Sequence, residues 1–194
     1  MIAFLRGEFV YKTPTVVHMD VSGVGYELQI SLNTYSRIQH LDNGILQTYY
    51  QVREDGHTLY GFFDQVEKNM FIQLISVSGV GAATARMMLS SMKPEEIGKA
   101  ILQGNSAQLE SIKGIGKKSS ERIVLELRDK MGKIVPETNI SSLINNTLEQ
   151  DALNALTALG IARPAAEQAL KKVLVNASGQ DKLEDIIKKV LKIL

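Results

Sequence analysis

The amino-acid sequence predicts an α+β protein in which a small β-barrel is followed by helical domains. Three observations support this prediction. Apolar and polar side chains alternate near the N-terminus, apolar residues from Asp64 onward recur with a helical period, and a Gly-hydrophobic-Gly segment occurs twice in the middle of the chain. The chain has 194 residues, enough for two to three small domains.

Residues 1–63 are predicted to form about five short strands, because turn-forming Gly, Pro, Asp and Asn residues divide them into short apolar runs. The most regular run is the alternation of Tyr26, Leu28, Ile30 and Leu32 with polar residues. This is the period of a strand with one buried face. Short strands at this spacing favour a small barrel.

The rest of the chain is predicted to be helical, in two domains. A first domain, 64–131, begins with Asp64 and Glu67 at the spacing of a capping box. Residues 132–147 are polar and lack a sustained period, which predicts a flexible linker. The tail, 148–194, has the apolar spacing of three short helices.

A segment that is repeated in the middle domain indicates where the chain binds its ligand. Residues 74–81 and 109–116 share a pattern that ends in Gly-hydrophobic-Gly, and their offset is 35 residues throughout. Each copy is predicted to end one helix and start the next within three residues, a turn that glycine permits. The new helix exposes unpaired N–H groups and the positive end of its dipole, which together form an anion site. Phosphate bound in this way is recognised without regard to base sequence.

The two copies differ in charge. Lysines surround the second copy, whereas Ala82 and Ala83 follow the first and Arg86 is its nearest cation. A single Gly-x-Gly can merely turn the chain between packed helices, but two copies at a fixed offset favour phosphate binding. The candidate phosphate-binding residues are Gly79, Val80, Gly81, Lys113, Gly114, Ile115, Gly116, Lys117, Lys118 and Arg122.

Composition excludes several other classes of protein. The chain has no cysteine, so disulfides, thiolate zinc sites and iron–sulfur clusters are excluded. The three histidines lack ligand-like spacing, and neither glycine segment fits a dinucleotide or P-loop motif, so we expect no metal or cofactor. No apolar stretch is long enough to span a bilayer, so we expect a cytoplasmic protein without a membrane partner.

The whole chain resembles the RuvA family of Holliday-junction-binding proteins. The segments that carry the resemblance are residues 1–7, 21–27, 52–55, 59–62, 114–118 and 158–160. The resemblance implies an N-terminal OB-fold barrel, a double helix-hairpin-helix domain, a loose linker and a small helical domain. Ala82-Ala83 depart from the basic residues common in such hairpins, so side-chain phosphate contacts are not expected there.

The resemblance also implies a function and partners. Members bind four-way junction DNA as a homotetramer or octamer and recruit the hexameric RuvB ATPase, with the RuvC resolvase as a further partner. It implies that Glu54 and Asp55 form an acidic pin at the junction centre, although charge alone fits a solvated turn. The expected motor contacts are Leu156, Leu159 and Ile161, which also fit the core of a three-helix domain.

Two other functions remain open from the sequence. One is a helix-hairpin-helix repair enzyme, such as a glycosylase or nuclease, which needs a base-flipping pocket and a catalytic Asp or Lys. After the second hairpin, the acidic candidates Glu121, Glu126 and Asp129 lie on a charged helix without an aromatic wedge. The other is a protein-interaction scaffold. The expectation is therefore a non-catalytic DNA-binding adaptor.

Overall fold

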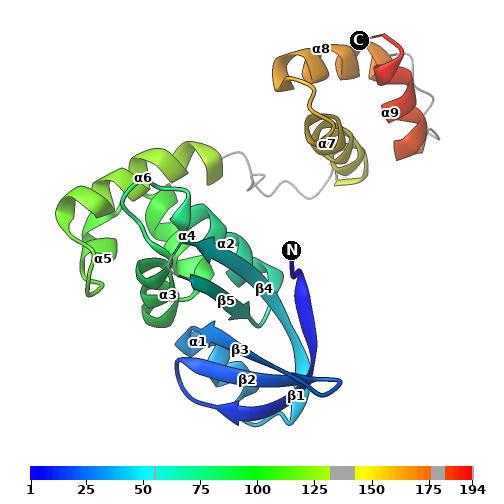
Figure 1. Cartoon of the computed structure of the whole chain (residues 1–194). Helices are drawn as coiled ribbons and strands as arrows, with labels where there is room; N and C mark the ends of the chain where they lie inside the picture. The colour runs from blue at the N-terminus through cyan, green and yellow to red at the C-terminus, as the bar shows by residue number, and fades with distance from the viewer. Residues whose placement is uncertain (55, 132–142, 176–181, 194) are drawn as a thin grey trace. The chain divides into compact units, whose positions relative to one another are not determined.

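The structure is a computed structural model. It describes residues 1–54, 56–131, 143–175 and 182–193. By their internal contacts the residues form two units, Met1–Pro136 and Glu137–Leu194 (Figure 1).

The first unit begins with a closed five-stranded barrel, as the sequence predicts. Its strands follow the order β1-β2-β3-β5-β4, with β4 pairing back to β1. All neighbours are antiparallel except β3 and β5, which run parallel. The strands are β1 (Phe4–Lys12), β2 (Val16–Val21), β3 (Val24–Ile30), β4 (Asn43–Arg53) and β5 (Gly56–Phe62).

The barrel core follows from the strand alternation. In β3 the side chains of Leu28 and Ile30 are fully buried, and Val17 and Met19 of β2 point to the same interior. Burial of each such side chain stabilises the fold by about 1.5–3 kcal/mol. Closure removes the free edges that would otherwise pair with other chains.

A helix that the sequence analysis did not predict lies between β3 and β4. It is α1 (Leu32–Ile38), and the Ser31 hydroxyl caps its start by accepting from Thr34 N. The prediction that Leu32 continues the buried alternation was wrong, because the strand ends at Ile30 and Leu32 is 46% exposed. Ile38, at the other end of α1, is fully buried in the barrel core.

Five helices complete the first unit, in agreement with the predicted helical domain. They are α2 (Gln65–Ile75), α3 (Ala82–Ser91), α4 (Pro94–Leu102), α5 (Ser106–Glu110) and α6 (Lys117–Met131). Asp64 caps α2 by accepting from Glu67 N at 2.9 Å. The Glu67 side chain does not complete the expected capping box. It turns instead toward α1, where Ser31 and Thr34 donate to its two oxygens.

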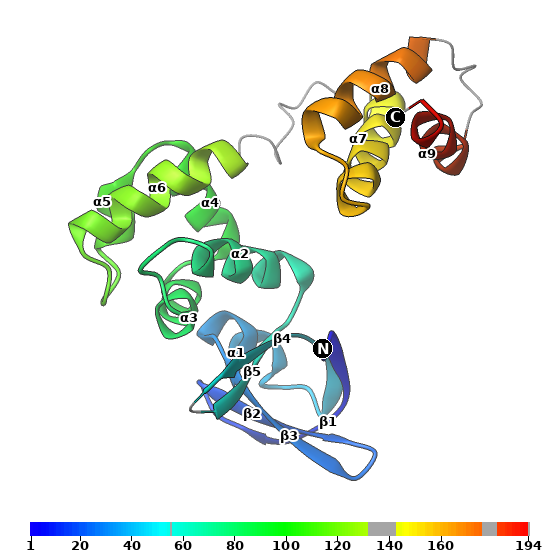
Figure 2. The ribbon, with the colours of Figure 1, turned by 45° about the horizontal axis from the view of Figure 1, so that its top comes forward.

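The barrel and the five helices are packed together in one unit. Phe71 of α2 lies against Tyr49, Tyr60 and Phe62 of the barrel, with ring centroids 4.9–5.4 Å apart. Helix α1 lies beside α3 (Figure 2). The side chain of Asn33 in α1 donates to Leu89 O and Met92 O at the end of α3. The boundary predicted at residue 63 is therefore a change of architecture inside one unit rather than a separation of two bodies.

The described residues of the second unit form three helices, as expected for the tail. They are α7 (Leu143–Ala158), α8 (Arg163–Val175) and α9 (Leu183–Leu191), and they bury a core that includes Leu170 and Val190. Helix α7 begins inside the predicted linker, 132–147, of which residues 132–142 lie outside the described residues. The linker therefore stays a prediction for residues 132–142 only.

Candidate nucleic-acid interface

Two helical hairpins, α2–α3 and α5–α6, share one backbone geometry. Val80 N donates to Val77 O at 3.0 Å, and Ile115 N donates to Ile112 O at 3.1 Å. The turn bonds that precede these, and the first helical bond that follows, also occur in both copies at an offset of 35 residues. The repeat seen in the sequence is thus a repeat of main-chain hydrogen bonds.

The first glycine of each hairpin is required by the turn itself. Gly79 has φ of 88° and Gly114 has φ of 92°, both in the left-handed region. Any other L-residue would be strained in this conformation. These two glycines therefore set the shape of the turn.

The second glycine of each hairpin has no such role. Gly81 has φ of −82°, and Gly116 is not among the described residues with positive φ. A Cβ atom built at either position would meet no described atom within 4 Å. The fold of this chain therefore does not require glycine there, and the missing side chain leaves open space at the start of α3 and α6. The first N–H groups of a helix lack intrahelical partners and carry the positive end of its dipole, so this space suits an anion.

Val80 and Ile115, predicted among the phosphate-binding residues, anchor the turns. Their side chains are 6% and 5% exposed and belong to the core of the helical region. Their N–H groups are already used inside the turn. The sequence pattern identified the motif, but it did not distinguish the buried Val80 and Ile115 from the exposed glycines beside them.

Positive charge is concentrated at the second hairpin. Lys113, Lys117 and Lys118 are all exposed. At the corresponding positions of the first hairpin, Ala82 is buried and Ala83 is exposed. An anion at the second turn would meet both main-chain N–H groups and ammonium groups, whereas one at the first turn would meet mainly the backbone.

Arg122 and Lys130 of α6 connect the second hairpin to the first. Arg122 donates to Ser78 O at 3.4 Å and also lies 3.6 Å from the Glu126 carboxylate. Lys130 Nζ donates to Ser76 Oγ at 3.3 Å. Both acceptors belong to the turn between α2 and α3, so α6 ties the two turns together. Lys130 was not singled out from the sequence, because the contact spans 54 residues.

Glu54, one of the two residues of the predicted acidic pin, directly follows β4 at the end of the β4–β5 hairpin. Glu54 is exposed, while Asp55 lies outside the described residues. Near the base of this hairpin, Tyr50 Oη lies 2.6 Å from His57 Nδ1. The last register pair, Arg53 with Gly56, places the turn at the end of two paired strands.

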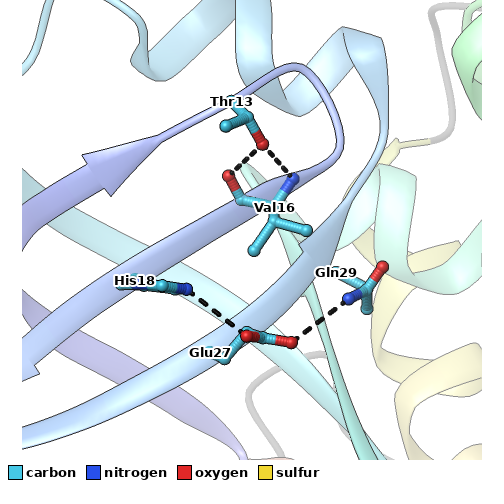
Figure 3. Close-up of polar contacts among 5 residues, drawn as sticks. All are labelled: Thr13, Val16, His18, Glu27 and Gln29. Carbon is cyan, nitrogen blue, oxygen red and sulfur yellow. Dashed lines mark hydrogen bonds and ion pairs between the residues drawn. The ribbon is translucent and has the colours of Figure 1, made fainter.

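The remaining histidines and acidic residues do not form a metal centre in the described part of the chain, where no cluster of three or more such ligands occurs. His18 Nε2 lies 3.4 Å from Glu27 on the barrel surface (Figure 3). Among the described residues, no helix is long and apolar enough to cross a membrane.

The three residues predicted to contact a motor differ in exposure. Leu156 is fully buried in the core of the second unit, which fits the alternative expectation that these residues form the core of a three-helix domain. Leu159 is 64% exposed. Ile161 is half-buried and packs against the same core.

Comparison with known proteins agrees with this layout. Residues 1–61 match the RuvA N terminal domain, residues 71–129 match a SAM-like helix-hairpin-helix tandem, and residues 147–194 match the RuvA C-terminal domain. The Holliday junction branch migration complex subunit RuvA of Cytophaga hutchinsonii is 41% identical over 197 residues, covering 99% of each chain. The chain belongs to the RuvA family.

Two further RuvA relatives have the same full-length match. The proteins of Christiangramia forsetii and Flavobacterium psychrophilum, both named Holliday junction branch migration complex subunit RuvA, are each 42% identical over 192 residues. Each alignment covers 99% of this chain and 99% of the relative. The three matched segments, two from RuvA domains and one from a helix-hairpin-helix tandem, follow the observed elements: the barrel, the two hairpins, and α7 to α9.

Proposed function

We propose that this chain binds four-way (Holliday) DNA junctions through backbone phosphates and serves as the junction-binding subunit of a branch-migration complex. The observation that carries the proposal is the repeated hairpin with an open glycine at each helix start. Main-chain N–H groups bind phosphate without reading bases. A branch point that moves through any sequence needs a protein whose binding to DNA does not depend on the bases.

In this proposal the second hairpin supplies most of the electrostatic attraction. Lys113, Lys117 and Lys118 neutralise phosphates and release their counterions, which makes affinity depend on salt. The first hairpin contributes mainly main-chain contacts. The two turns act together because Arg122 links α6 to the carbonyl of Ser78.

Selectivity for a junction is assigned to Glu54 and Asp55. In a homotetramer, or in an octamer of two tetramers, four such turns meet near the symmetry axis. Their carboxylates lie within about 8 Å of one another, the Debye length at physiological salt, so screening leaves their field in place. This field repels the phosphates of a duplex laid across the centre, whereas a junction leaves its centre open.

The chain itself is proposed to be non-catalytic and to need no cofactor. The RuvB hexamer supplies ATP hydrolysis, and the RuvC resolvase acts on the same junction. Of the three expected motor contacts, exposed Leu159 and half-buried Ile161 are the ones whose side chains reach the surface of the second unit. Because the proposed substrate is chromosomal DNA of a bacterium, the protein acts in the cytoplasm.

Junction binding is tested by titrating the protein into a labelled four-way junction and a duplex of the same sequence, at several salt concentrations. We expect tighter binding to the junction and a linear fall of log affinity with log salt. Native mass spectrometry with and without junction gives the number of subunits. Equal affinity for junction and duplex would refute the proposal.

The acidic pin is tested by Glu54→Gln together with Asp55→Asn. Removing both charges should raise affinity for the duplex more than for the junction, because repulsion of the duplex is lost. Competition between the two DNAs at one fixed salt concentration measures the ratio. An unchanged ratio would mean that these residues form an ordinary solvated turn.

The motor contact is tested by ending the chain after residue 131. The shortened protein should bind a junction but fail to support branch migration by RuvB. Leu159→Ser in the full chain should weaken the motor complex without affecting junction binding. Full branch migration by the shortened protein would exclude the second unit as the motor contact.

A further inference from the structure

We propose that Arg86 is a positioning residue that fixes the first hairpin against the barrel, and that it is not a phosphate ligand. The proposal rests on the proposed function, because it concerns how the DNA-binding turn is held. Arg86 lies on α3, about one turn after Gly81, and its charge would be the obvious substitute for the lysines that the first hairpin lacks. Its contacts point elsewhere.

The guanidinium of Arg86 is bound to the barrel through two acceptors. Its Nη1 donates to Thr15 O at 3.2 Å and to the side-chain oxygen of Gln29. Thr15 lies in the turn between β1 and β2, and Gln29 lies on β3. The side chain is only partly exposed. One arginine of the helical region therefore bridges two barrel segments.

The side-chain amide of Gln29 is oriented by a hydrogen bond that does not involve Arg86. Its amide nitrogen donates to Glu27 Oε1 at 3.4 Å, and the other oxygen of Glu27 lies 3.4 Å from His18 Nε2. Figure 3 shows the nitrogen of Gln29 turned toward Glu27 and its oxygen turned away. Only that oxygen can accept from a guanidinium, so Glu27 sets the amide in the orientation that binds Arg86.

The Thr15 carbonyl is held in the same way. Thr13 closes the β1–β2 turn, because its hydroxyl donates to Val16 O and accepts from Val16 N, each at 3.0 Å (Figure 3). Thr15 O also accepts from Ile30 N at 3.0 Å. Two strands thus fix the carbonyl that Arg86 contacts. Such a pre-arranged receptor lowers the conformational entropy lost when the arginine binds.

The position of Arg86 along α3 explains what the contact does. The far end of α3 is held by α1: Asn33 donates to Leu89 O and Met92 O, and Leu32 N donates to Ser90 Oγ. The hairpin turn is at the opposite end. Arg86 lies between these two ends and stops α3 from pivoting about the α1 contacts. The barrel therefore contributes to the direction of the open N–H groups of the first hairpin, in addition to the contacts that α6 makes with Ser76 and Ser78.

The test compares Arg86→Ala, Gln29→Ala and the double variant in junction binding over a range of salt. A positioning role predicts that Arg86→Ala weakens binding several-fold and that Gln29→Ala, which leaves the contact with Thr15 O in place, weakens it less. The double variant should be no worse than Arg86→Ala alone, because the Gln29 contact is already lost when the arginine is removed. It also predicts an unchanged log–log salt slope. A phosphate ligand would instead lower the slope by about 0.9 in Arg86→Ala and leave Gln29→Ala unaffected. That result would overturn the proposal.

Lys99→Ala is the matched control, because it removes one exposed positive charge from α4 at a position outside this network. It should leave junction affinity within about twofold. Thermal unfolding of every variant shows whether the unit is still folded. If Lys99→Ala weakens binding as much as Arg86→Ala, bulk charge explains the effect and the positioning role is excluded.

A measurement without DNA separates this inference from the proposed function. The chain contains no cysteine, so Val24→Cys and Ala83→Cys give two unique sites for spin labels on the barrel and beside the first hairpin. Arg86→Ala and Gln29→Ala should each broaden the distance distribution between the labels. An unchanged distribution would refute the positioning role. Failure of the unmodified protein to bind a junction would refute only the proposed function.

Discussion

The two hairpins have the same main-chain geometry but are supported differently. The first has Ala82 and Ala83 at its helix start and is tied to the barrel through Arg86. The second has Lys117 and Lys118 at the same positions and has exposed lysines on both sides of its turn. The two copies share their main-chain geometry, but only the second has exposed lysines at its turn.

In the proposed function, this difference makes shape and charge separable parts of phosphate binding. Main-chain N–H groups at an open glycine supply direction and close contact. Lysine side chains supply long-range attraction that salt weakens. A hairpin without lysines still has the first part, provided that its orientation is fixed from outside. The first three predictions below separate the two parts, and the fourth concerns a buried carboxyl group in α2.

The largest effect is expected from removing charge at the second hairpin, with Lys117→Ala and Lys118→Ala combined. At about 1 kcal/mol for each exposed lysine, junction affinity should fall roughly 30-fold. The log–log salt slope should flatten by about 0.9 for each lost phosphate contact. Lys171→Ala with Lys188→Ala removes the same charge from the second unit and should change neither quantity. A slope equal to that of the unmodified protein would exclude these lysines as phosphate ligands.

The next largest effect is expected from filling the open space in either hairpin, with Gly81→Ala or Gly116→Ala. A methyl group there meets no described atom of the protein, so only about 0.5–1 kcal/mol of helix-start stability is lost. It should displace a phosphate and weaken a charge-assisted hydrogen bond worth about 1.5 kcal/mol, or roughly tenfold in Kd. The salt slope should stay the same, unlike in the lysine variant.

Gly98→Ala provides the control for the glycine variants. It adds the same methyl group inside α4, where the nearest atom is Met70 Cε at 3.7 Å. This is an ordinary van der Waals distance, so binding should be unchanged. If only Gly116→Ala weakens binding, the first hairpin does not contact DNA and the comparison between the hairpins loses its meaning.

A smaller effect, in the opposite direction, is expected from adding charge to the first hairpin with Ala83→Lys. Ala83 is exposed and corresponds to Lys118. One new phosphate contact should tighten junction binding about fivefold and steepen the salt slope by about 0.9. Ala165→Lys, which adds a lysine to the second unit, should have no effect. If the salt slopes of Ala83→Lys and Ala165→Lys are equal, the first hairpin does not contact phosphate.

The smallest effect on binding is expected from Glu67→Gln in α2, the leading helix of the first hairpin. Burial raises the pKa of Glu67, although hydrogen bonds from Ser31, Thr34 and Phe63 N oppose the shift. A carboxyl group with a raised pKa in the folded protein is most stabilising below its ordinary pKa of 4.5. Its contribution falls as pH rises through the folded-state value.

The stability of the unmodified protein relative to Glu67→Gln should therefore decrease from acidic to neutral pH. Each tenfold difference in the proton affinity of Glu67 between the folded and unfolded states changes the free energy of unfolding by about 1.4 kcal/mol. All six tyrosines lie in the barrel region and the chain has no tryptophan, so tyrosine fluorescence during urea unfolding reports on the first unit alone. If the difference in stability between the unmodified protein and Glu67→Gln does not change with pH, burial does not raise the pKa of Glu67.

The features that the sequence predicted are those encoded by neighbouring residues. The 35-residue repeat, the glycine turns within it and the five short strands all depend on local patterns, so residues 74–81 and 109–116 were sufficient to identify the hairpins. The apolar period of the tail predicted three helices. It did not distinguish buried Leu156 from exposed Leu159, because that depends on which face of α7 meets α8 and α9.

The features that the sequence did not predict depend on contacts between distant residues. Glu67 has capping-box spacing, yet its side chain turns to Ser31 and Thr34, which are 33 to 36 positions away. Arg86 was the nearest cation to the first hairpin, and its partner Gln29 is 57 residues away. Helix α1 was missed because Leu32 continues the apolar alternation of β3 after the strand has ended. Tertiary packing overrides local pattern in all three cases.

The packing of barrel and hairpins into one unit has a consequence for the DNA. A protein surface that keeps its shape leaves bending and unstacking to the nucleic acid, and pyrimidine–purine steps such as TA and CA deform most easily. A branch point should therefore dwell longer on flexible steps than on stiff A-tracts, although no base is read. Sequence would then enter the motion of the junction through the mechanics of the double helix alone.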